Sequence, residues 1–521
     1  MMIGENGFIS MVGAVLCILV VWCGWNVLEW IWWRPKKLER VLKEQGIKIT
    51  PYNLLIGDLK ESHRQSKEAR SKPMDLSHDI VSSVLPFHFQ TIQKYGKKSA
   101  FWFGTIPKLY IMDPDLIRDI LSNKFGHFGL IKGNPLSRFF VRGVISYEGE
   151  KWAIHRKIIN SAFHMEKLKR MLSAFYTSSN EMVSKWEKLV TLEGSCELDV
   201  WPELKNLTGD IISRAAFGSS YEEGKWIFKL LDEQAELFVQ SFQTAFIPGF
   251  SLLPIKRNKR IKEIHKEIND LLMDIINQRK KAMKDGEANN DDLLGLLLES
   301  NQNEIQGNKN KKNVGMTMED VIEECKLLYF GGHETTSVLL VWTMIVLSMH
   351  PKWQVRARDE VLQIFGMNKP TFEGLSHLKI VTMILYEVLR LYPPALFLNR
   401  CTYKNIKLGE LSLPPGIHLM LPIVLIHHDR ELWGEDAQEF KPERFAEGIS
   451  KATKNQVSFF PFSWGPKVCI GQNFAMTEAK MVLALILQQF AFKLSPSYSH
   501  APTNVLTLHP QYGAQIILHK L

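Results

Sequence analysis

Cysteine is scarce in this chain, and the cysteines present do not pair at metal-binding spacing. The 521 residues contain six, no C-x-x-C occurs, and all but the first two lie far apart: Cys17, Cys23, Cys196, Cys325, Cys401 and Cys469. This distribution disfavours both zinc sites built from cysteine pairs and the disulfide framework of a small secreted domain. We therefore expect the body of the chain to face a reducing compartment.

Internal repeats, long low-complexity tracts and nucleic-acid motifs are also lacking. No basic stretch is interleaved with aromatic residues as in a known nucleic-acid module, so we expect no nucleic-acid partner. An excess of 64 basic over 55 acidic residues gives a net charge of +9, which suits an anionic membrane surface or an acidic protein partner. With 521 residues, 45% of them hydrophobic, the chain can form one large domain or two of average size.

The longest uncharged segment lies at the N-terminus. No residue from Phe8 to Trp25 is charged, and this run is long enough to cross a bilayer core of about 30 Å. The residues after it are typical of a membrane interface followed by a cytoplasmic anchor: Trp30, Trp32, Trp33, Arg34, Lys36, Lys37 and Arg40. A cleaved signal peptide is the alternative, but its basic start, shorter apolar core and small-residue cleavage site are absent. We predict a membrane anchor over residues 1–33, a hinge over 34–60 and the main domain over 61–521.

Cys469 lies in a turn that favours a metal-binding thiol. Glycines stand four residues before it and two after it, and an apolar, helix-forming run follows from Asn473 to Phe492. A cysteine just before a helix faces unpaired backbone N–H groups and the positive end of the helix dipole, and both stabilise the thiolate. Gly465 can take a positive φ in the turn, and Gly471 leaves room for a flat, bulky group against the backbone. A buried cysteine beside a turn is the alternative interpretation.

A second motif lies inside a long apolar helix. Thr317 to Asp320 matches a capping box, and the helical pattern continues to the proline at 351, which predicts a helix of about 48 Å. Its centre reads Gly331-Gly332-His333-Glu334-Thr335-Thr336. The two glycines cost about 2 kcal/mol of helix propensity, and the Thr335 hydroxyl can bond the Gly331 carbonyl in place of a helix N–H. We predict a groove there, lined by Glu334 and Thr335; close packing of another helix on the glycines is the alternative.

Weaker motifs occur before Cys469. Trp152 and Arg156 lie one helical turn apart, which by itself indicates a surface cation–π pair more often than a site. An E-x-x-R at Glu387 and Arg390 is followed by the P-E-R-F of residues 442–445. The order of these motifs along the chain makes the combination more informative than any one of them.

Other patterns carry less information. Residues 61–64 also match E-x-x-R, so that motif alone is weak. Adjacent residues of a strand point to opposite sides, so His427 and His428 do not suit a shared metal. An apolar, strand-like run ends in Arg400, and another apolar stretch extends from Leu237 to Leu253.

Together, these motifs resemble those of the cytochrome P450 monooxygenases, and the resemblance covers essentially the whole chain. It implies a mainly α fold with small β-sheets (α+β) behind an N-terminal transmembrane helix. It also implies haem b, iron protoporphyrin IX, with the Cys469 thiolate as axial ligand of the iron. Residues 61–521 would then form the haem-thiolate catalytic domain.

The resemblance assigns further residues to the cofactor and the reaction. The ones that would hold a haem propionate or flank the sulfur are Trp152, Arg156, Arg400, Lys467, Phe462 and Gly471. Lys467 departs from the arginine usual in the family; it keeps the charge but loses the fork of donors, so we expect a weaker propionate clamp. Glu334 and Thr335 would deliver protons. The Glu387–Arg390 pair and the arginine at 444 would form a structural network behind the haem, and the stretch from Leu237 would roof the substrate pocket.

The resemblance is closest to plant microsomal members of the seventy-two clan, which include secologanin synthase and triterpenoid oxidases. It implies an oxidoreductase that inserts one atom of O₂ into a C–H bond of a small apolar substrate. A bulky terpenoid is the expected class, with a triterpenoid favoured. Electrons would come from NADPH through NADPH–cytochrome P450 reductase. The anchor implies a single pass through the endoplasmic reticulum membrane, with the catalytic domain facing the cytosol.

Two other functions remain open from the sequence. A thiolate-haem isomerase or dehydratase would act without O₂ or a reductase, although it would need neither Glu334 nor Thr335 for proton delivery. In a non-catalytic haem-binding membrane protein, two protein ligands would coordinate the iron.

Overall fold

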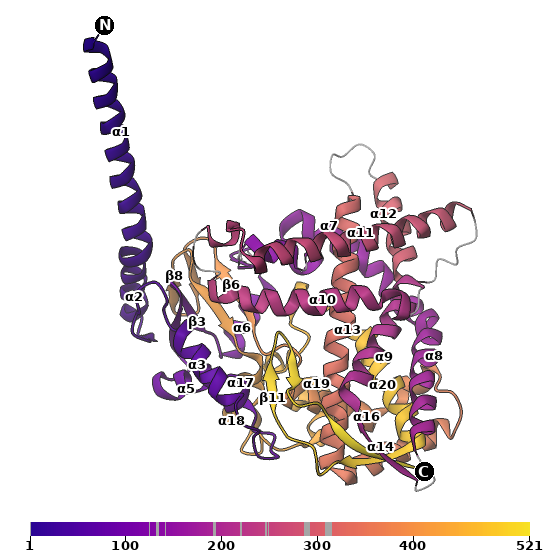
Figure 1. Ribbon diagram of the computed structural model, residues 1–521. Helices are drawn as coiled ribbons and strands as arrows, with labels where there is room; N and C mark the ends of the chain where they lie inside the picture. Colours follow the sequence, from indigo (N-terminus) through magenta and orange to yellow (C-terminus); the bar gives the residue numbers. More distant parts are fainter. Residues whose placement is uncertain are drawn as a thin grey trace.

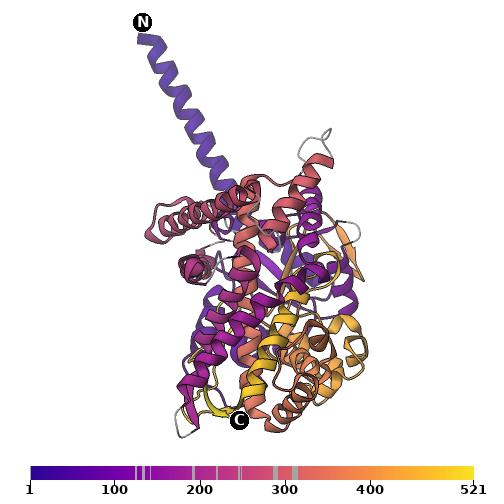
Figure 2. The ribbon, with the colours of Figure 1, turned by 90° about the vertical axis from the view of Figure 1, so that its right-hand side faces the viewer.

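A mainly helical body with small sheets carries one long helix that projects away from it (Figures 1 and 2). The computed structural model describes residues 2–123, 126–131, 135–140, 142–190, 194–218, 221–244, 247, 249–285, 292–307 and 315–521. The arrangement confirms the predicted fold class. Parts of the apolar stretch after Leu237, at 245–246 and 248, lie outside the described residues.

The α-helices of the body enclose a continuous apolar core. In chain order they are α2 Arg34–Glu44, α3 Leu59–Ala69, α4 Val81–Val84, α5 Pro86–Tyr95, α6 Pro114–Ser122, α7 Gly149–Ala162, α8 Met165–Leu189, α9 Val200–Phe217, α10 Tyr221–Ser241, α11 Lys256–Lys284, α12 Leu293–Gly307, α13 Met318–Met349, α14 Pro351–Phe365, α15 Phe372–His377, α16 Lys379–Leu391, α17 Ile423–His427, α18 Arg430–Trp433, α19 Ile449–Ala452 and α20 Gln472–Gln489.

Four sheets lie among the described residues. The largest has the strand order β1 (Lys48–Ile49), β2 (Ser99–Phe103), β3 (Ile106–Tyr110), β9 (His418–Leu421), β6 (Leu398–Thr402) and β4 (Phe128–Gly129). The second has the order β10 (Phe490–Leu494), β13 (Gln515–Lys520) and β5 (Ser195–Asp199). The two hairpins are β7 (Ile406–Leu408) with β8 (Leu411–Leu413), and β11 (Pro502–Asn504) with β12 (Leu508–Pro510).

Helix α13 runs through the centre of the body and packs against α9, α16 and α20 (Figure 1). The predicted capping box is present, because the Thr317 side chain accepts from the Asp320 N–H and the Asp320 carboxylate accepts from the Thr317 N–H. The helix then stays mostly buried until it ends at Met349, just before the proline. Strands β2 and β3 pair antiparallel, and the Asp113 side chain caps α6 by accepting from the N–H groups of Asp115 and Leu116.

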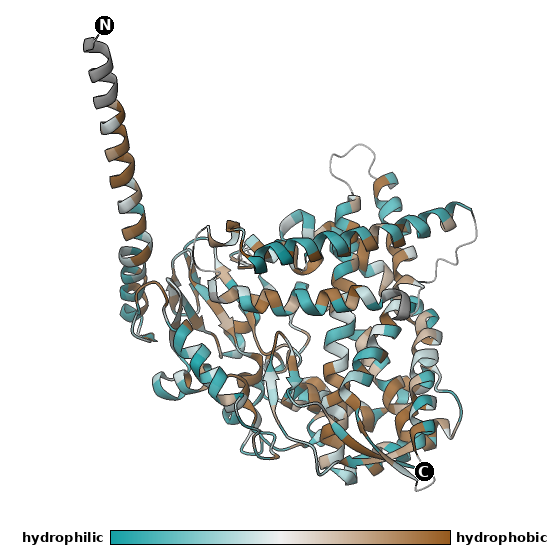
Figure 3. Ribbon diagram, in the orientation of Figure 1, coloured by the Kyte–Doolittle hydropathy of each residue, from teal (hydrophilic) through white to brown (hydrophobic). Residues whose placement is uncertain are grey.

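Helix α1 spans Met2–Leu28, and from Met11 on it is largely apolar and exposed (Figure 3). Within the part of the chain that the structure describes, two helical segments are long and apolar enough to cross a membrane. One is α13, most of which is buried inside the body; the other begins at Met11, and none of its apolar window is buried. The exposed segment is the one that suits a membrane anchor.

The segment after the anchor is helical and packed on the body. A π-helical turn, Glu29–Trp33, continues α1 directly into α2, and the Tyr52 hydroxyl donates to the Ile31 carbonyl at 2.6 Å. Leu38 and Leu42 of α2 are buried, and the Gln45 amide donates to the Ser412 carbonyl at 2.8 Å. Residues 34–60 therefore include ordered, packed structure. The division into 1–33, 34–60 and 61–521 stays a prediction.

Candidate functional site

The turn that carries Cys469 forms as the glycine pattern predicts. It enters α20 through Gly471, and the Cys469 N–H donates to the Phe462 carbonyl at 2.8 Å. Gly465 has φ +72°, and a Cβ there would lie 2.6 Å from the Leu121 carbonyl oxygen. Only glycine fits that position without strain. At Gly471 the nearest atom to a built Cβ is the Cys469 Sγ, 4.0 Å away, so the side of the sulfur next to Gly471 is open.

The Cys469 thiol is exposed, yet its surroundings resist ionisation. The residue is accessible, but the protein atoms around the sulfur desolvate its ionised form and raise its pKa above the ordinary value, while the Gly471 N–H, the Arg156 charge and the Gln472 N–H act in the opposite direction. The helix start therefore contributes as predicted, but desolvation outweighs it. A bound metal cation removes the proton of a coordinating thiol outright. The free thiol alone does not have the lowered pKa that the sequence led us to expect.

Three cationic side chains gather beside this turn. Lys467 Nζ donates to the Tyr147 carbonyl at 2.6 Å and lies 5.1 Å from the Trp152 ring centroid. Arg156 Nη1 donates to the Val468 carbonyl at 2.8 Å. Arg400 Nη1 donates to the carbonyl of the preceding residue at 2.8 Å.

The charges of this group are poorly balanced. Burial, and next the charge of Arg400, lower the pKa of Lys467 to about 8; Arg156 acts in the same direction and Glu148 opposes it. Burial also lowers the pKa of Arg156 and of Arg400. Glu148 already accepts from the Tyr403 hydroxyl at 2.8 Å and from the Leu130 N–H. A ligand that carries carboxylates next to an open cysteine fits this group, and a haem with its two propionates is such a ligand.

The two adjacent glycines of α13, Gly331 and Gly332, have different surroundings. A Cβ on Gly332 would lie 2.7 Å from Ile212 Cδ1 of α9, whereas a Cβ on Gly331 would meet nothing within 4 Å. Close helix packing therefore explains Gly332, and open space borders Gly331. The Thr335 hydroxyl donates to the Gly331 carbonyl at 2.7 Å, as predicted. Leu327, Gly331 and Thr335 lie on one face of α13, and each keeps some accessible surface.

Glu334 does not share that face. Its carboxylate accepts from the Thr507 hydroxyl at 2.6 Å and bonds to His509 Nε2, both on or beside β12, and Lys205 Nζ of α9 lies 3.7 Å away. Burial acts to raise the pKa of Glu334, but His509 and Lys205 hold it well below its usual range. Adjacent helical residues point about 100° apart. The prediction that the carboxylate lines the groove with Thr335 is therefore corrected.

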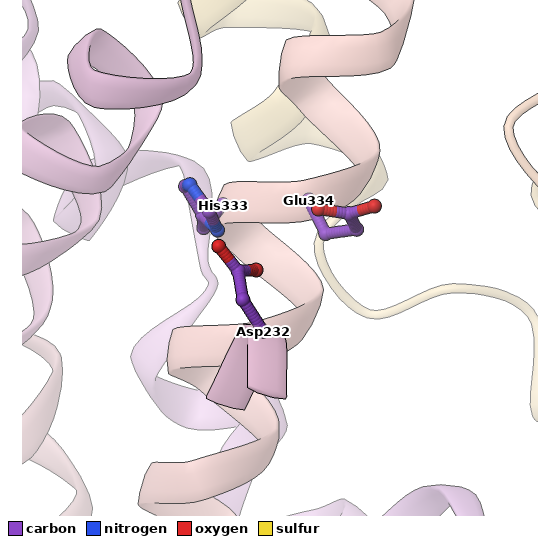
Figure 4. Close-up of side chains that lie close together, drawn as sticks. All are labelled: Asp232, His333 and Glu334. Atoms are coloured by element: carbon purple, nitrogen blue, oxygen red, sulfur yellow. The ribbon is translucent and has the colours of Figure 1, made fainter. Parts of the chain in front are cut away.

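The same acid belongs to a tight group of titratable side chains. Asp232, His333 and Glu334 offer ligand atoms within 4.8 Å of one another (Figure 4). Lys205 Nζ lies 2.8 Å from the Asp232 carboxylate and also faces Glu334. Because the Lys205 ammonium already lies between the two acids and His509 bonds to Glu334, this is an ion-pair network rather than a metal site. Sequence analysis missed Lys205, Asp232 and His509, since each lies about 100 or more residues from Glu334.

The predicted network of one acid and two arginines is present and buried. Arg390 binds both carboxylate oxygens of Glu387 at 2.7 Å, and the Arg444 Nε lies 3.5 Å from Glu387. Arg390 also donates to the carbonyls of His427, Ala437 and Glu439.

The two adjacent histidines, His427 and His428, form hydrogen bonds with backbone groups. The His427 Nε2 accepts from the Phe460 N–H, so its Nδ1 carries the proton and faces the Arg390 carbonyl. The His428 Nε2 bonds to the Leu391 carbonyl. His427 ends α17 rather than lying in a strand, so the reason given from the sequence was wrong although no shared metal site forms. The contact with Phe460 connects the arginine network to the cysteine turn.

Aromatic rings from three segments meet around Phe140. Phe140 stacks on Phe238 of α10 with centroids 4.9 Å apart, and its ring meets Phe330 of α13 edge-on at 5.0 Å. Phe242 lies beside Phe238 at 4.8 Å. This apolar group would favour a hydrophobic ligand over a charged one.

Known proteins are similar to this chain over nearly its whole length. A family model described as Cytochrome P450 matches residues 21–517. The chain belongs to the cytochrome P450 family. Cytochrome P450 CYP72A616 of Paris polyphylla is 57% identical over 518 residues, which cover 99% of this chain and 100% of that protein. Secologanin synthase 1 of Catharanthus roseus is 53% identical over 513 residues, 98% of each chain.

Membership confirms several expectations from the sequence. This P450 is an oxidoreductase of the monooxygenase type, and haem b bound through a thiolate is the cofactor of the family. The open cysteine and the unbalanced cations beside it fit that cofactor. The family uses O₂ and a redox partner, and the exposed apolar helix at the N-terminus fits membrane anchoring.

Proposed function

We propose that this P450 oxidises a bulky apolar terpenoid, with a triterpenoid favoured, using O₂ and electrons from NADPH. The observation that carries the proposal is the open Cys469 sulfur beside the group of Arg156, Arg400 and Lys467. The similarity to a protein named secologanin synthase supports plant metabolism. The aromatic group around Phe140 supports an apolar substrate.

The proposed roles follow the contacts described above. Cys469 would hold the haem iron through its thiolate, with Phe462 and Gly471 on either side of its turn. A larger set of side chains would hold the propionates: Trp152, Arg156, Arg400 and Lys467. When bound through a thiolate, haem supplies the reductive activation of O₂ and the cleavage of its O–O bond.

Two residues of α13 would deliver protons to the reaction. Thr335 holds a hydroxyl proton at Oγ1, which its bond to the Gly331 carbonyl orients. Glu334, one residue earlier, is connected toward the surface through His509, whose side chain is 20% exposed. We propose that Thr335 delivers protons and that Glu334 resupplies them, although in this conformation the carboxylate faces the β11–β12 hairpin.

The proposed partner is NADPH–cytochrome P450 reductase. The basic residues after the tryptophan cluster favour a cytosolic catalytic domain on a single-pass anchor. A reducing compartment also suits the free cysteines, and the endoplasmic reticulum is the membrane that we propose.

Reconstitution tests the proposed reaction. Purified protein with reductase, NADPH and a panel of terpenoids should consume NADPH, give an oxidised product that carries one atom of O₂, and show a substrate-induced shift of the haem spin state. Turnover without NADPH would favour the isomerase or dehydratase alternative. Failure of carbon monoxide to bind the reduced iron would favour a closed, non-catalytic haem protein.

The first prediction concerns coupling. Thr335→Ala should lower product formed per NADPH about tenfold and raise hydrogen peroxide release, since a positioned proton donor is lost. The matched control is Thr343→Ala, because Thr343 makes the same hydroxyl bond to the carbonyl four residues earlier, at 2.7 Å, and is fully buried. Equal uncoupling in both variants would remove Thr335 from proton delivery.

The second prediction concerns retention of haem. Lys467→Gln should release haem to apomyoglobin about ten times faster, because an ionic partner of the propionates is lost. Lys467→Arg should retain haem at least as well as the natural chain, since the guanidinium adds a second donor. Lys451→Gln, at an exposed position, is the control. Unchanged release from Lys467→Gln would show that this side chain does not hold a propionate.

A further inference from the structure

Three basic side chains converge where the N-terminal helix meets the largest sheet. Lys108 of β3 and His418 of β9 are paired in parallel register, so their side chains leave the same face of the sheet side by side. Arg34, the first residue of α2, lies over the next turn: a Cβ built on Gly416 would be 2.7 Å from its Nη2. Residues far apart in the sequence thus form one basic cluster, which comprises Arg34, Lys108 and His418.

No acidic group neutralises this basic cluster within the described residues. Neither Arg34 nor Lys108 takes part in an ion pair or a side-chain hydrogen bond there. The Lys108 ammonium rests 4.4 Å from the Phe103 ring centroid, its one described partner. His88 is the other titratable group that faces Lys108, and it bonds to the Tyr110 hydroxyl.

His418, the third residue of the basic cluster, has a polar side-chain atom without a hydrogen-bond partner. Nδ1 of His418 is buried and has no hydrogen-bond partner. Burial, and then the charges of Lys108 and Arg34, lower the pKa of His418 to about 3. Burial also lowers the pKa of Lys108 to about 8. Burying a polar atom or a cation without a partner costs free energy. A bound anion would provide the missing partner and reduce that cost.

The position of the basic cluster indicates which anion it would meet. Arg34 directly follows the exposed Trp32 and Trp33, and interfacial tryptophans mark the depth of lipid headgroups. The charges of Arg34 and Lys108 both act on His418, and guanidinium and ammonium groups are both common phosphate ligands. Lys36 lies on the same turn but about 200° around α2 from Arg34, and its ammonium pairs with Glu39 at 2.9 Å.

We propose that Arg34, Lys108 and His418 form a phosphate-binding site that takes the headgroup of an anionic phospholipid. The proposal rests on insertion of the N-terminal helix into a membrane and is independent of the oxidised substrate. A headgroup held there would fix the height and tilt of the body above the bilayer, because Arg34 belongs to the helix that continues from the anchor. Free phosphate is the other source of the same chemistry.

The test uses the full-length holoprotein in a neutral detergent. Short-chain phosphatidic acid, phosphatidylcholine of equal chain length and inorganic phosphate are titrated separately and followed by calorimetry. We expect saturable binding of phosphatidic acid, at least tenfold tighter than that of inorganic phosphate and absent for phosphatidylcholine. Equal affinity for phosphatidic acid and inorganic phosphate would support a phosphate site not specific for lipid. No saturable binding of either anion would overturn the site.

Variants separate a site from general attraction to positive charge. Arg34→Gln and Lys108→Gln should each weaken phosphatidic acid about fivefold or more. Lys36→Gln removes the same charge at the same depth from the opposite side of α2 and should change the affinity less than twofold. Equal losses in all three would overturn the proposal in favour of diffuse attraction. The carbon monoxide band of the reduced haem reports folding in each variant, and Arg34→Gln, at an exposed position, keeps the test valid if Lys108→Gln does not fold.

Discussion

Cys469→Ser should abolish monooxygenase activity, by more than about a thousandfold, and with it the carbon monoxide band typical of thiolate-bound haem. A serine hydroxyl is far less acidic than a thiol and a much poorer ligand for iron, so the electron donation that favours O–O cleavage is lost. Measurement requires a carbon monoxide difference spectrum, a haem determination and product analysis on the same sample. Any haem that remains should show the band of a neutral ligand.

Cys196→Ser is the control for this substitution. Cys196 lies in β5, away from the turn of Cys469, and is half-buried and unpaired by a disulfide. It should keep the thiolate band and the activity of the natural chain. A thiolate band that survives in Cys469→Ser would assign the ligand to another cysteine and remove the basis of the proposed function.

The pKa of Cys469 makes this result informative. In the absence of a metal, burial outweighs the helix start and the thiol resists ionisation. A bound iron would remove the thiol proton. Sequence analysis identified the helix start and the glycines but not the desolvation, because burial at Cys469 comes from the packing of distant segments.

Predictions from local sequence were accurate where the physics is local. The Thr317 capping box, the positive φ of Gly465 and the Thr335–Gly331 bond all involve residues within a few positions of one another. Backbone geometry alone determines such contacts. For the same reason, no local pattern distinguished Gly331, beside open space, from Gly332, packed on Ile212.

Contacts between distant segments account for what sequence analysis missed. The carboxylate of Glu334 is directed by Lys205 and His509, which are more than 100 residues away on either side. The basic cluster is of the same kind, because the register of β3 with β9 brings Lys108 beside His418. Family resemblance supplied the Glu387–Arg390–Arg444 network, which composition and spacing alone could not place inside the body.

The second large effect is expected from a substitution in the buried Glu387–Arg390–Arg444 network. Glu387→Ala should prevent accumulation of the folded haem protein, because it leaves the fully buried Arg390 without its bidentate partner. Removing one member of a buried ion pair costs about 3–5 kcal/mol, a large part of the stability of an ordinary domain. The Lys441 N–H and the Arg444 guanidinium lose the same acceptor. Holoprotein yield and the carbon monoxide band measure the outcome.

The chain contains its own control for that substitution. Glu61 and Arg64 form the same E-x-x-R and the same ion pair, at 2.6 Å, but both side chains are largely exposed. An exposed pair contributes about 0–1 kcal/mol, so Glu61→Ala should leave the yield and the band unchanged. Similar losses from Glu61→Ala and Glu387→Ala would contradict the argument that burial, rather than the motif, makes the network essential. Glu387→Gln should fall between them, since it keeps one acceptor oxygen but leaves the Arg390 charge unbalanced.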